Sequence, residues 1–102
     1  MPTLIYKPGQ SDEASYAIGA EPVIIGRADE HAVSIPDKSL SRAHARIERE
    51  GEALFVVDLA SKNGTFVNGN RVTRQRLRQG DTLLLGDVAF VYSADDAADA
   101  TA

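Results

Sequence analysis

Three short segments of this chain combine hydrogen-bond donors or fixed positive charges with residues that favour turns. They are residues 26–27 (Gly-Arg), 41–44 (Ser-Arg-Ala-His) and 61–69, which begins Ser-Lys-Asn-Gly-Thr and ends Asn-Gly. Guanidinium and ammonium groups, hydroxyls and backbone N–H groups are the donors that hold phosphate oxygens. No nucleophile elbow is present. The chemistry that these segments favour is therefore binding of a phosphate without cleavage.

Arg27 and Ser41 are the leading candidates in the first two segments. Arg27 follows a glycine at the end of a β-branched apolar run, and its planar guanidinium suits phosphate oxygens. Ser41 offers a compact hydroxyl and a backbone donor, and Arg42 adds charge at the next position. Taken singly, these are a surface arginine and a turn of ordinary composition. Ser41 is preferred to Ser39 because only Ser41 has a histidine three residues later.

The third segment contains two Asn-Gly pairs. Such pairs tolerate a left-handed backbone, so residues 61–64 predict a tight loop that presents Lys62 and Asn63. The second pair lies between the predicted strands at residues 65–67 and 70–72 and predicts a type I′ hairpin turn. Gly64 and Gly69 are therefore assigned to backbone shape rather than to ligand contact.

Composition excludes several classes of protein. The 102 residues are enough for one domain with a modest core. Without cysteine, the chain forms no disulfide and no thiolate metal site, and neither a metal nor a cofactor is expected. No apolar run approaches the roughly 20 residues of a membrane helix, and residues 1–10 lack the apolar stretch of a signal peptide. A soluble cytoplasmic protein is expected.

The net charge of −4 arises at the two ends of the chain. Residues 26–92 hold ten Lys/Arg against nine Asp/Glu, so the middle is nearly neutral. No strongly basic face is implied, which argues against general binding of nucleic acid. A single phosphate needs only a few well-placed cations, so the local arrangement of charged residues, rather than the net charge of the chain, determines whether a phosphate can bind.

Most of the chain has the pattern of short strands separated by turns. Residues 43–48 alternate apolar and polar side chains, as a half-buried strand does. Residues 54–57 are apolar on both parities, which predicts a central strand covered on both faces. Further strands are expected at residues 3–7, 15–18, 22–25, 65–67, 70–72, 82–85 and 88–92. This pattern predicts an all-β sandwich or barrel.

The chain is expected to form one domain, at residues 1–93. Neither an internal repeat nor a second domain is evident. Residues 94–102 are rich in Ala and Asp and contain no large apolar side chain, so they are expected to form a disordered acidic tail.

The ordered set of motifs, GR…SRxH…SxNGTxxNG, resembles the forkhead-associated (FHA) domain, a phosphothreonine-binding module. The resemblance covers roughly residues 22–92. It implies a two-sheet β-sandwich (FHA/SMAD-like) of mostly antiparallel short strands, with binding loops at one end. It also implies a non-catalytic adaptor or regulator in Ser/Thr kinase signalling. Its partner would be a phosphothreonine-containing protein or peptide, with a Ser/Thr protein kinase or its substrate involved, and neither nucleic acid nor membrane.

The resemblance implies a role for each motif residue. The phosphopeptide-binding positions are Arg27, Ser41, Arg42, Lys62 and Asn63. The loop-supporting positions are Gly26, His44, Ser61, Gly64, Thr65, Asn68 and Gly69. Asn63 would hold the peptide main chain through its amide, and His44 would pack beneath the loops. Peptide positions beyond the phosphothreonine would be contacted by loop residues such as Lys62 and those at 29–31.

Two alternatives remain open. The first is a phosphate-independent interaction or assembly module that uses the same sandwich, through a sheet face. The second is a hydrolase with Ser41, His44 and Asp58 as a triad. A serine and a histidine three residues apart at the head of one strand are poorly placed for that chemistry.

Overall fold

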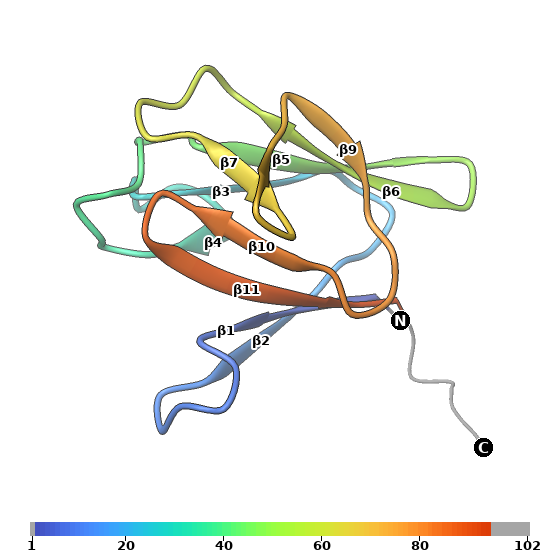
Figure 1. Cartoon of the computed structure of the whole chain (residues 1–102), viewed down its shortest axis with the longest axis horizontal. Helices are drawn as coiled ribbons and strands as arrows, with labels where there is room; N and C mark the ends of the chain where they lie inside the picture. Colours follow the sequence, from blue (N-terminus) through green and yellow to red (C-terminus); the bar gives the residue numbers. More distant parts are fainter. Residues whose placement is uncertain (1, 95–102) are drawn as a thin grey trace.

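The computed structural model describes residues 2–94, which form eleven strands in two sheets (Figure 1). The six-stranded sheet has the order β2 (Ala14–Ala17), β1 (Thr3–Tyr6), β11 (Val88–Ser93), β10 (Thr82–Leu85), β7 (Thr65–Val67) and β8 (Asn70–Arg71). The five-stranded sheet has the order β4 (Val33–Ser34), β3 (Val23–Gly26), β5 (Ala45–Glu50), β6 (Ala53–Asp58) and β9 (Arg74–Arg76). Among residues 2–94, only β3 and β4 pair in parallel. The predicted all-β, two-sheet architecture is confirmed.

A single hydrophobic core joins the two sheets. The five-stranded sheet contributes alternate residues such as Ile25, Ile47 and Val56, and the six-stranded sheet contributes Leu83 and Phe90, all of them fully buried. Each such side chain contributes about 1.5–3 kcal/mol by leaving water. The period-two pattern in the sequence therefore supplies one inward face per sheet, and packing those faces together positions the connecting loops.

The second Asn-Gly pair forms the predicted hairpin turn. Asn68 and Gly69 have φ values of 51° and 87°, as a type I′ turn requires, and they join β7 to β8 in antiparallel register. Asn68 also bonds to the first residue of β10 and to the residue before it, because its Oδ1 accepts the Thr82 N–H (3.0 Å) and its Nδ2 donates to Asp81 (3.0 Å). This turn is thereby attached to the six-stranded sheet.

The sequence predictions needed correction at four strands. The alternating strand begins at Ala45 rather than at residue 43, and β4 and β9 were not predicted. The prediction that β6 is covered on both faces was wrong, because Phe55 and Val57 are only half-buried. A side chain rather than a second layer covers Phe55, since the guanidinium carbon of Arg74 lies 3.9 Å from the centre of its ring.

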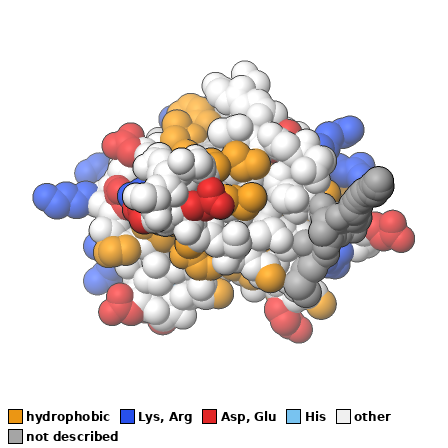
Figure 2. Space-filling model, turned by 90° about the horizontal axis from the view of Figure 1, so that it is seen from below, with side chains coloured by type: hydrophobic (Ala, Val, Ile, Leu, Met, Phe, Trp, Pro, Cys, Tyr) orange, Lys and Arg blue, Asp and Glu red, His pale blue; other side chains and the backbone are white. Residues whose placement is uncertain are grey.

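The outer side of the molecule near β1 and β2 exposes hydrophobic side chains between charged groups (Figure 2). Leu84 is the large hydrophobic residue most exposed in the described part of the chain, at 38%. Within residues 2–94 no helix has the length and apolar character needed to cross a bilayer. The predicted acidic tail lies outside the described residues except for Ala94, which packs against the core.

Candidate functional site

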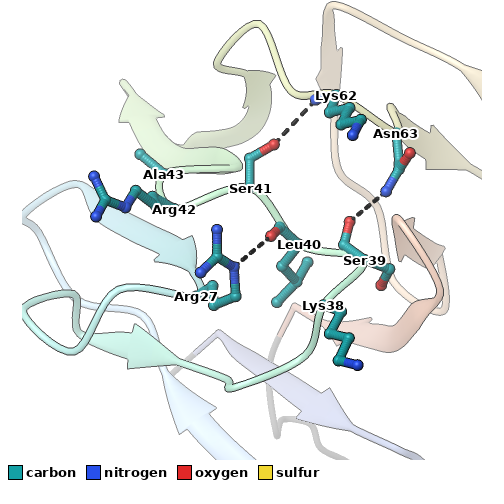
Figure 3. A pocket seen from close by; sticks show the side chains of 9 residues that line it. All are labelled: Arg27, Lys38, Ser39, Leu40, Ser41, Arg42, Ala43, Lys62 and Asn63. Atoms are coloured by element: carbon teal, nitrogen blue, oxygen red, sulfur yellow. Dashed lines mark hydrogen bonds between the residues drawn. The ribbon is translucent and has the colours of Figure 1, made fainter.

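The three motif segments converge at one end of the sandwich and line a common pocket (Figure 3). The Arg27 N–H donates to the Ser41 carbonyl (3.0 Å), and the Arg27 Nε–H donates to the Leu40 carbonyl (3.1 Å). The Lys62 N–H donates to Ser41 Oγ (3.0 Å). Segments separated by up to 35 positions, from Arg27 to Lys62, are thus joined by direct hydrogen bonds at Ser41 and its neighbour.

Gly26 is needed because two backbones pass very close together at the end of β3. A methyl group at this position would collide with the Arg42 carbonyl and would lie 3.0 Å from the Ala43 Cα. Both atoms belong to the backbone and cannot rotate away. Glycine here therefore allows the loop that carries Ser41 to lie directly against the strand that carries Arg27.

His44 is fully buried beneath the loops and connects two of them. Its Nδ1 accepts the Ser41 N–H (3.1 Å), and its Nε2 lies 2.9 Å from the Gly64 carbonyl. One ring nitrogen must accept and the other must donate, so the ring is a neutral imidazole with its proton on Nε2. The histidine holds the Ser41 loop against the Gly64 loop.

Asp58, at the end of β6, organises the loop at residues 61–65. Its carboxylate accepts the Ser61 hydroxyl (2.5 Å), the Ser61 N–H (3.2 Å) and the Thr65 hydroxyl (2.7 Å). Ser61 Oγ in turn accepts the Gly64 N–H (3.0 Å). From the sequence, Asp58 was a candidate only as a triad acid, and its role in this loop was not predicted. The detectable signal was an Asp three residues before a Ser, a spacing typical of side-chain-capped turns.

The same contacts set the acidity of Asp58. Burial acts to raise the pKa of the Asp58 carboxyl, but hydrogen bonds from Ser61 and Thr65 outweigh it and hold the pKa below its ordinary value. The carboxylate therefore stays ionised at neutral pH and keeps its role as an acceptor for the loop.

The Ser41 hydroxyl is free to donate, whereas the Ser39 hydroxyl is not. Ser41 Oγ accepts the Lys62 N–H, and its own hydroxyl proton has no acceptor among residues 2–94. Ser39 Oγ donates to Asp37 (2.7 Å) and accepts the Asp87 N–H (2.9 Å). Hydrogen bonds from the Ser39 hydroxyl and the Ser39 N–H (2.9 Å) hold the pKa of the Asp37 carboxyl below its ordinary value. Of the two serines, Ser41 is the one available to an incoming anion.

The pocket is open, has a volume of about 460 Å³ and is strongly positive. Four cationic residues line it: Arg27, Lys38, Arg42 and Lys62. No acidic side chain lines it, and none of the four has an acidic partner in the described part of the chain. Lys38 was not predicted as a site residue, because it lies in a segment of ordinary turn composition. Cations without counter-ions are suited to holding an anion.

Asn63 lies at the rim with part of its amide already used. Its Nδ2 donates to the Ser39 carbonyl (2.8 Å), which fixes the side chain across the pocket. Its Oδ1 has no partner among residues 2–94 and can accept an N–H from a ligand. The remaining predicted positions are Asn68 and Gly69, which occupy the β7–β8 turn and do not line the pocket.

The suggested hydrolase triad is not assembled. His44 accepts the backbone N–H of Ser41 rather than its hydroxyl, and the carboxylate of Asp58 bonds to Ser61 and Thr65 instead of His44. Residues 2–94 also contain no group of His, Asp or Glu side chains arranged to hold a metal ion. The polar side chains at this end hold loops in place.

Comparison with known proteins links this arrangement to one family. The FHA domain family matches residues 23–86. The chain is 30% identical over 89 residues to the oxoglutarate dehydrogenase inhibitor of Corynebacterium jeikeium, covering 87% of this chain and 62% of that protein. It is 33% identical over 88 residues to the FHA domain-containing protein FhaB of Mycobacterium tuberculosis, covering 85% of this chain and 57% of that protein. The chain thus spans less than two thirds of each relative.

Solved structures with similar folds include FHA domains bound to partners. The FhaA FHA domain complexed with the intracellular domain of Rv3910 aligns with a TM-score of 0.82 and 32% identity, over 90% of this chain and 99% of that one. A domain solved in work on phosphothreonine-dependent FHA domain interactions aligns with a TM-score of 0.77 and 32% identity, over 90% of this chain and 94% of that one.

Proposed function

The chain belongs to the FHA domain family, and we propose that it is a non-catalytic module that binds phosphothreonine segments of partner proteins. The observation that carries this proposal is the positive pocket in which Arg27, Ser41 and Lys62 meet while none of its lining residues is acidic. A neighbouring structure from work on phosphothreonine-dependent interactions supports the choice of ligand. The proposed context is Ser/Thr kinase signalling, with the partner being a kinase or its substrate.

Each pocket residue has a proposed part in holding the ligand. The terminal amino groups of Arg27 and the hydroxyl of Ser41 bind phosphate oxygens, and Arg42 and Lys62 add charge. Asn63 Oδ1 accepts a main-chain N–H of the peptide. Charge-assisted hydrogen bonds contribute about 1.5–3 kcal/mol each. Three or four of them, less the cost of ordering a flexible peptide, correspond to micromolar affinity, which is a binding free energy of about −8 kcal/mol.

The preference for threonine over serine is proposed to rest on burial of its methyl group. One buried methyl group contributes about 0.8 kcal/mol, which is less than a tenfold difference in affinity. A cytoplasmic location fits the proposed role, because protein kinases use intracellular ATP. No cofactor, nucleic acid or membrane enters the proposal.

Titration of a phosphothreonine peptide tests the proposal. The Arg27→Ala and Ser41→Ala variants should each bind about tenfold or more weakly, since each loses a charge-assisted contact. Arg78→Ala is a matched control, because the Arg78 side chain is exposed and forms no ion pair in the described chain. The residue follows β9 near the Leu54 end of β6, away from Asp58. Calorimetry or fluorescence anisotropy gives the affinities. Equal affinity for the phosphorylated and unphosphorylated peptides would overturn the proposal.

The phosphate-independent alternative has its own supporting observation. The outer face of the six-stranded sheet carries Phe66, Leu84, Ala89 and Val91, whose registers place them on neighbouring strands. Apolar side chains on an outer face are common in soluble proteins, so this observation is less specific than the pocket. A partner complex that survives phosphatase treatment would favour the alternative.

A further inference from the structure

A second hollow adjoins the phosphate pocket and shares one of its walls. It is lined by Arg27, Ala28, Asp29, Glu30, His31, Arg42 and Ala43, and its volume is about 480 Å³. Arg27, Arg42 and Ala43 also line the first pocket. A segment whose phosphate occupies the first pocket therefore has its neighbouring residues beside the second. We call the second hollow the annex.

The two hollows differ in charge. The first has four cationic side chains and no acidic one, whereas the annex adds Asp29 and Glu30. Neither carboxylate has a hydrogen bond or an ion pair among residues 2–94. A phosphate in the first pocket would neutralise the shared Arg27 and Arg42. The annex would then present net negative charge beside the bound phosphate.

The loop that carries these acids has a fixed base. The Arg27 and Ala28 N–H groups donate to the Ser41 and Arg42 carbonyls (3.0 and 3.3 Å), and the His31 N–H donates to the Ala28 carbonyl (3.4 Å). The His31 Nε2 atom is buried without a hydrogen-bond partner, although buried polar atoms nearly always have one. The annex is thus anchored to the first pocket and contains a ring nitrogen, His31 Nε2, that can still form a hydrogen bond.

We propose that the annex selects a lysine or arginine side chain that lies close to the phosphothreonine in the bound segment. This inference rests on the proposed function and names the substrate class more narrowly. Because the hollows share a wall, the span between phosphate and basic group is a few residues of extended chain, at about 3.3 Å per residue. Asp29 and Glu30 are its specificity-determining residues, and among residues 2–94 their carboxylates form no ion pair with the cationic side chains of the first pocket.

A lysine scan of the peptide tests the inference. The reference is a phosphothreonine peptide with alanine at every flanking position; lysine, and separately glutamate, is then placed at each flanking position in turn. At the position that reaches the annex, lysine should improve affinity about twofold to tenfold over alanine, as expected for one or two exposed ion pairs. That advantage should shrink as ionic strength rises, because salt screens exposed charges.

The decisive variant is Asp29→Asn with Glu30→Gln. It should remove the advantage of lysine while changing affinity for the all-alanine peptide by less than about twofold. Glu21→Gln with Glu52→Gln is the matched control, because it makes the same change in net charge at two exposed residues outside both hollows. This control should keep the advantage of lysine.

The other outcomes contradict either the annex inference alone or the proposed function as well. If the all-alanine peptide binds but the lysine scan is flat, or the advantage survives in the decisive variant, the annex inference is wrong and the proposed function stands. If glutamate rather than lysine improves binding, Arg42 selects an acidic side chain and the inference is also wrong. If no phosphorylated peptide binds, the proposed function itself fails.

Discussion

Two neighbouring loops at the binding end are built in contrasting ways. The loop at residues 61–65 is held in place by side-chain hydrogen bonds from beneath it. Asp58 bonds both Ser61 and Thr65, and His44 bonds Gly64. His44 and Thr65 are fully buried. The loop at residues 28–31 has one internal backbone hydrogen bond, and the exposed Asp29 and Glu30 side chains at its tip have no partner within the described part of the chain.

The contrast separates two tasks of a recognition site. Donors that are already held in place lose little conformational freedom when a ligand arrives, so a pre-organised phosphate site gains affinity. Side chains at an exposed loop tip have little effect on stability and can change without disturbing the fold. We therefore propose that the rigid loops bind the phosphate and that the exposed loop sets the sequence preference.

The largest effect is expected from Gly26→Ala. The added methyl group collides with the Arg42 carbonyl, so the loop at residues 41–43 must move. We expect a loss of about 3 kcal/mol in the free energy of unfolding and loss of measurable peptide binding. Gly19→Ala is the matched control, since a methyl group there meets no atom within 4 Å. Urea denaturation and peptide titration measure both quantities; unchanged binding by a stable Gly26→Ala variant would contradict the close approach of the two backbones.

A smaller effect, dependent on pH, is expected from Asp58→Asn. An amide offers one acceptor where the carboxylate receives three donors, so the variant should lose about 1–3 kcal/mol of unfolding free energy at pH 7. Because the folded-state pKa of Asp58 is lowered, its contribution is present above the unfolded pKa of about 3.9 and is lost as pH falls through the folded value.

The stability gap between wild type and Asp58→Asn should therefore narrow below about pH 4. Asp37, whose pKa is also lowered, is retained in both proteins, so the difference isolates Asp58. Denaturation curves between pH 3 and pH 7 give the difference in unfolding free energy between the two proteins. They are measured without ligand, so that the titration of a bound phosphate does not contribute. A gap of equal size at both ends of that range would refute the assigned role of the carboxylate.

The smallest effect is expected in the exposed loop. Glu30→Ala should change the free energy of unfolding by less than about 0.5 kcal/mol, since the side chain has no partner in the described structure. Ser61→Ala, in the loop closed by Asp58, should cost about 1 kcal/mol or more under the same conditions. Similar losses in the two variants would remove the contrast between the loops.

The strands that sequence reasoning missed show what local pattern lacks. β9 reads Arg-Gln-Arg and has no apolar alternation. It forms because Arg74 lies over the Phe55 ring and pairs with Glu48 and Glu50 across the sheet. β4 has only two residues, and its parallel pairing with β3 depends on the path of the intervening loop. Both strands follow from neighbours distant in sequence, which no local window contains.

Local sequence pattern was sufficient to predict the alternation that makes two inward faces, the Asn-Gly turn between β7 and β8, and the order of the motif residues. These features depend on side-chain type at short spacing, which is visible in the chain. Only the folded arrangement of the chain makes Arg27, Ser41 and Lys62 meet. It also lets Asp58 hold a loop and puts Asp29 and Glu30 in the hollow beside the pocket. These outcomes arise from the register of strands and the close approach of backbones, which exist only once the two sheets have packed together.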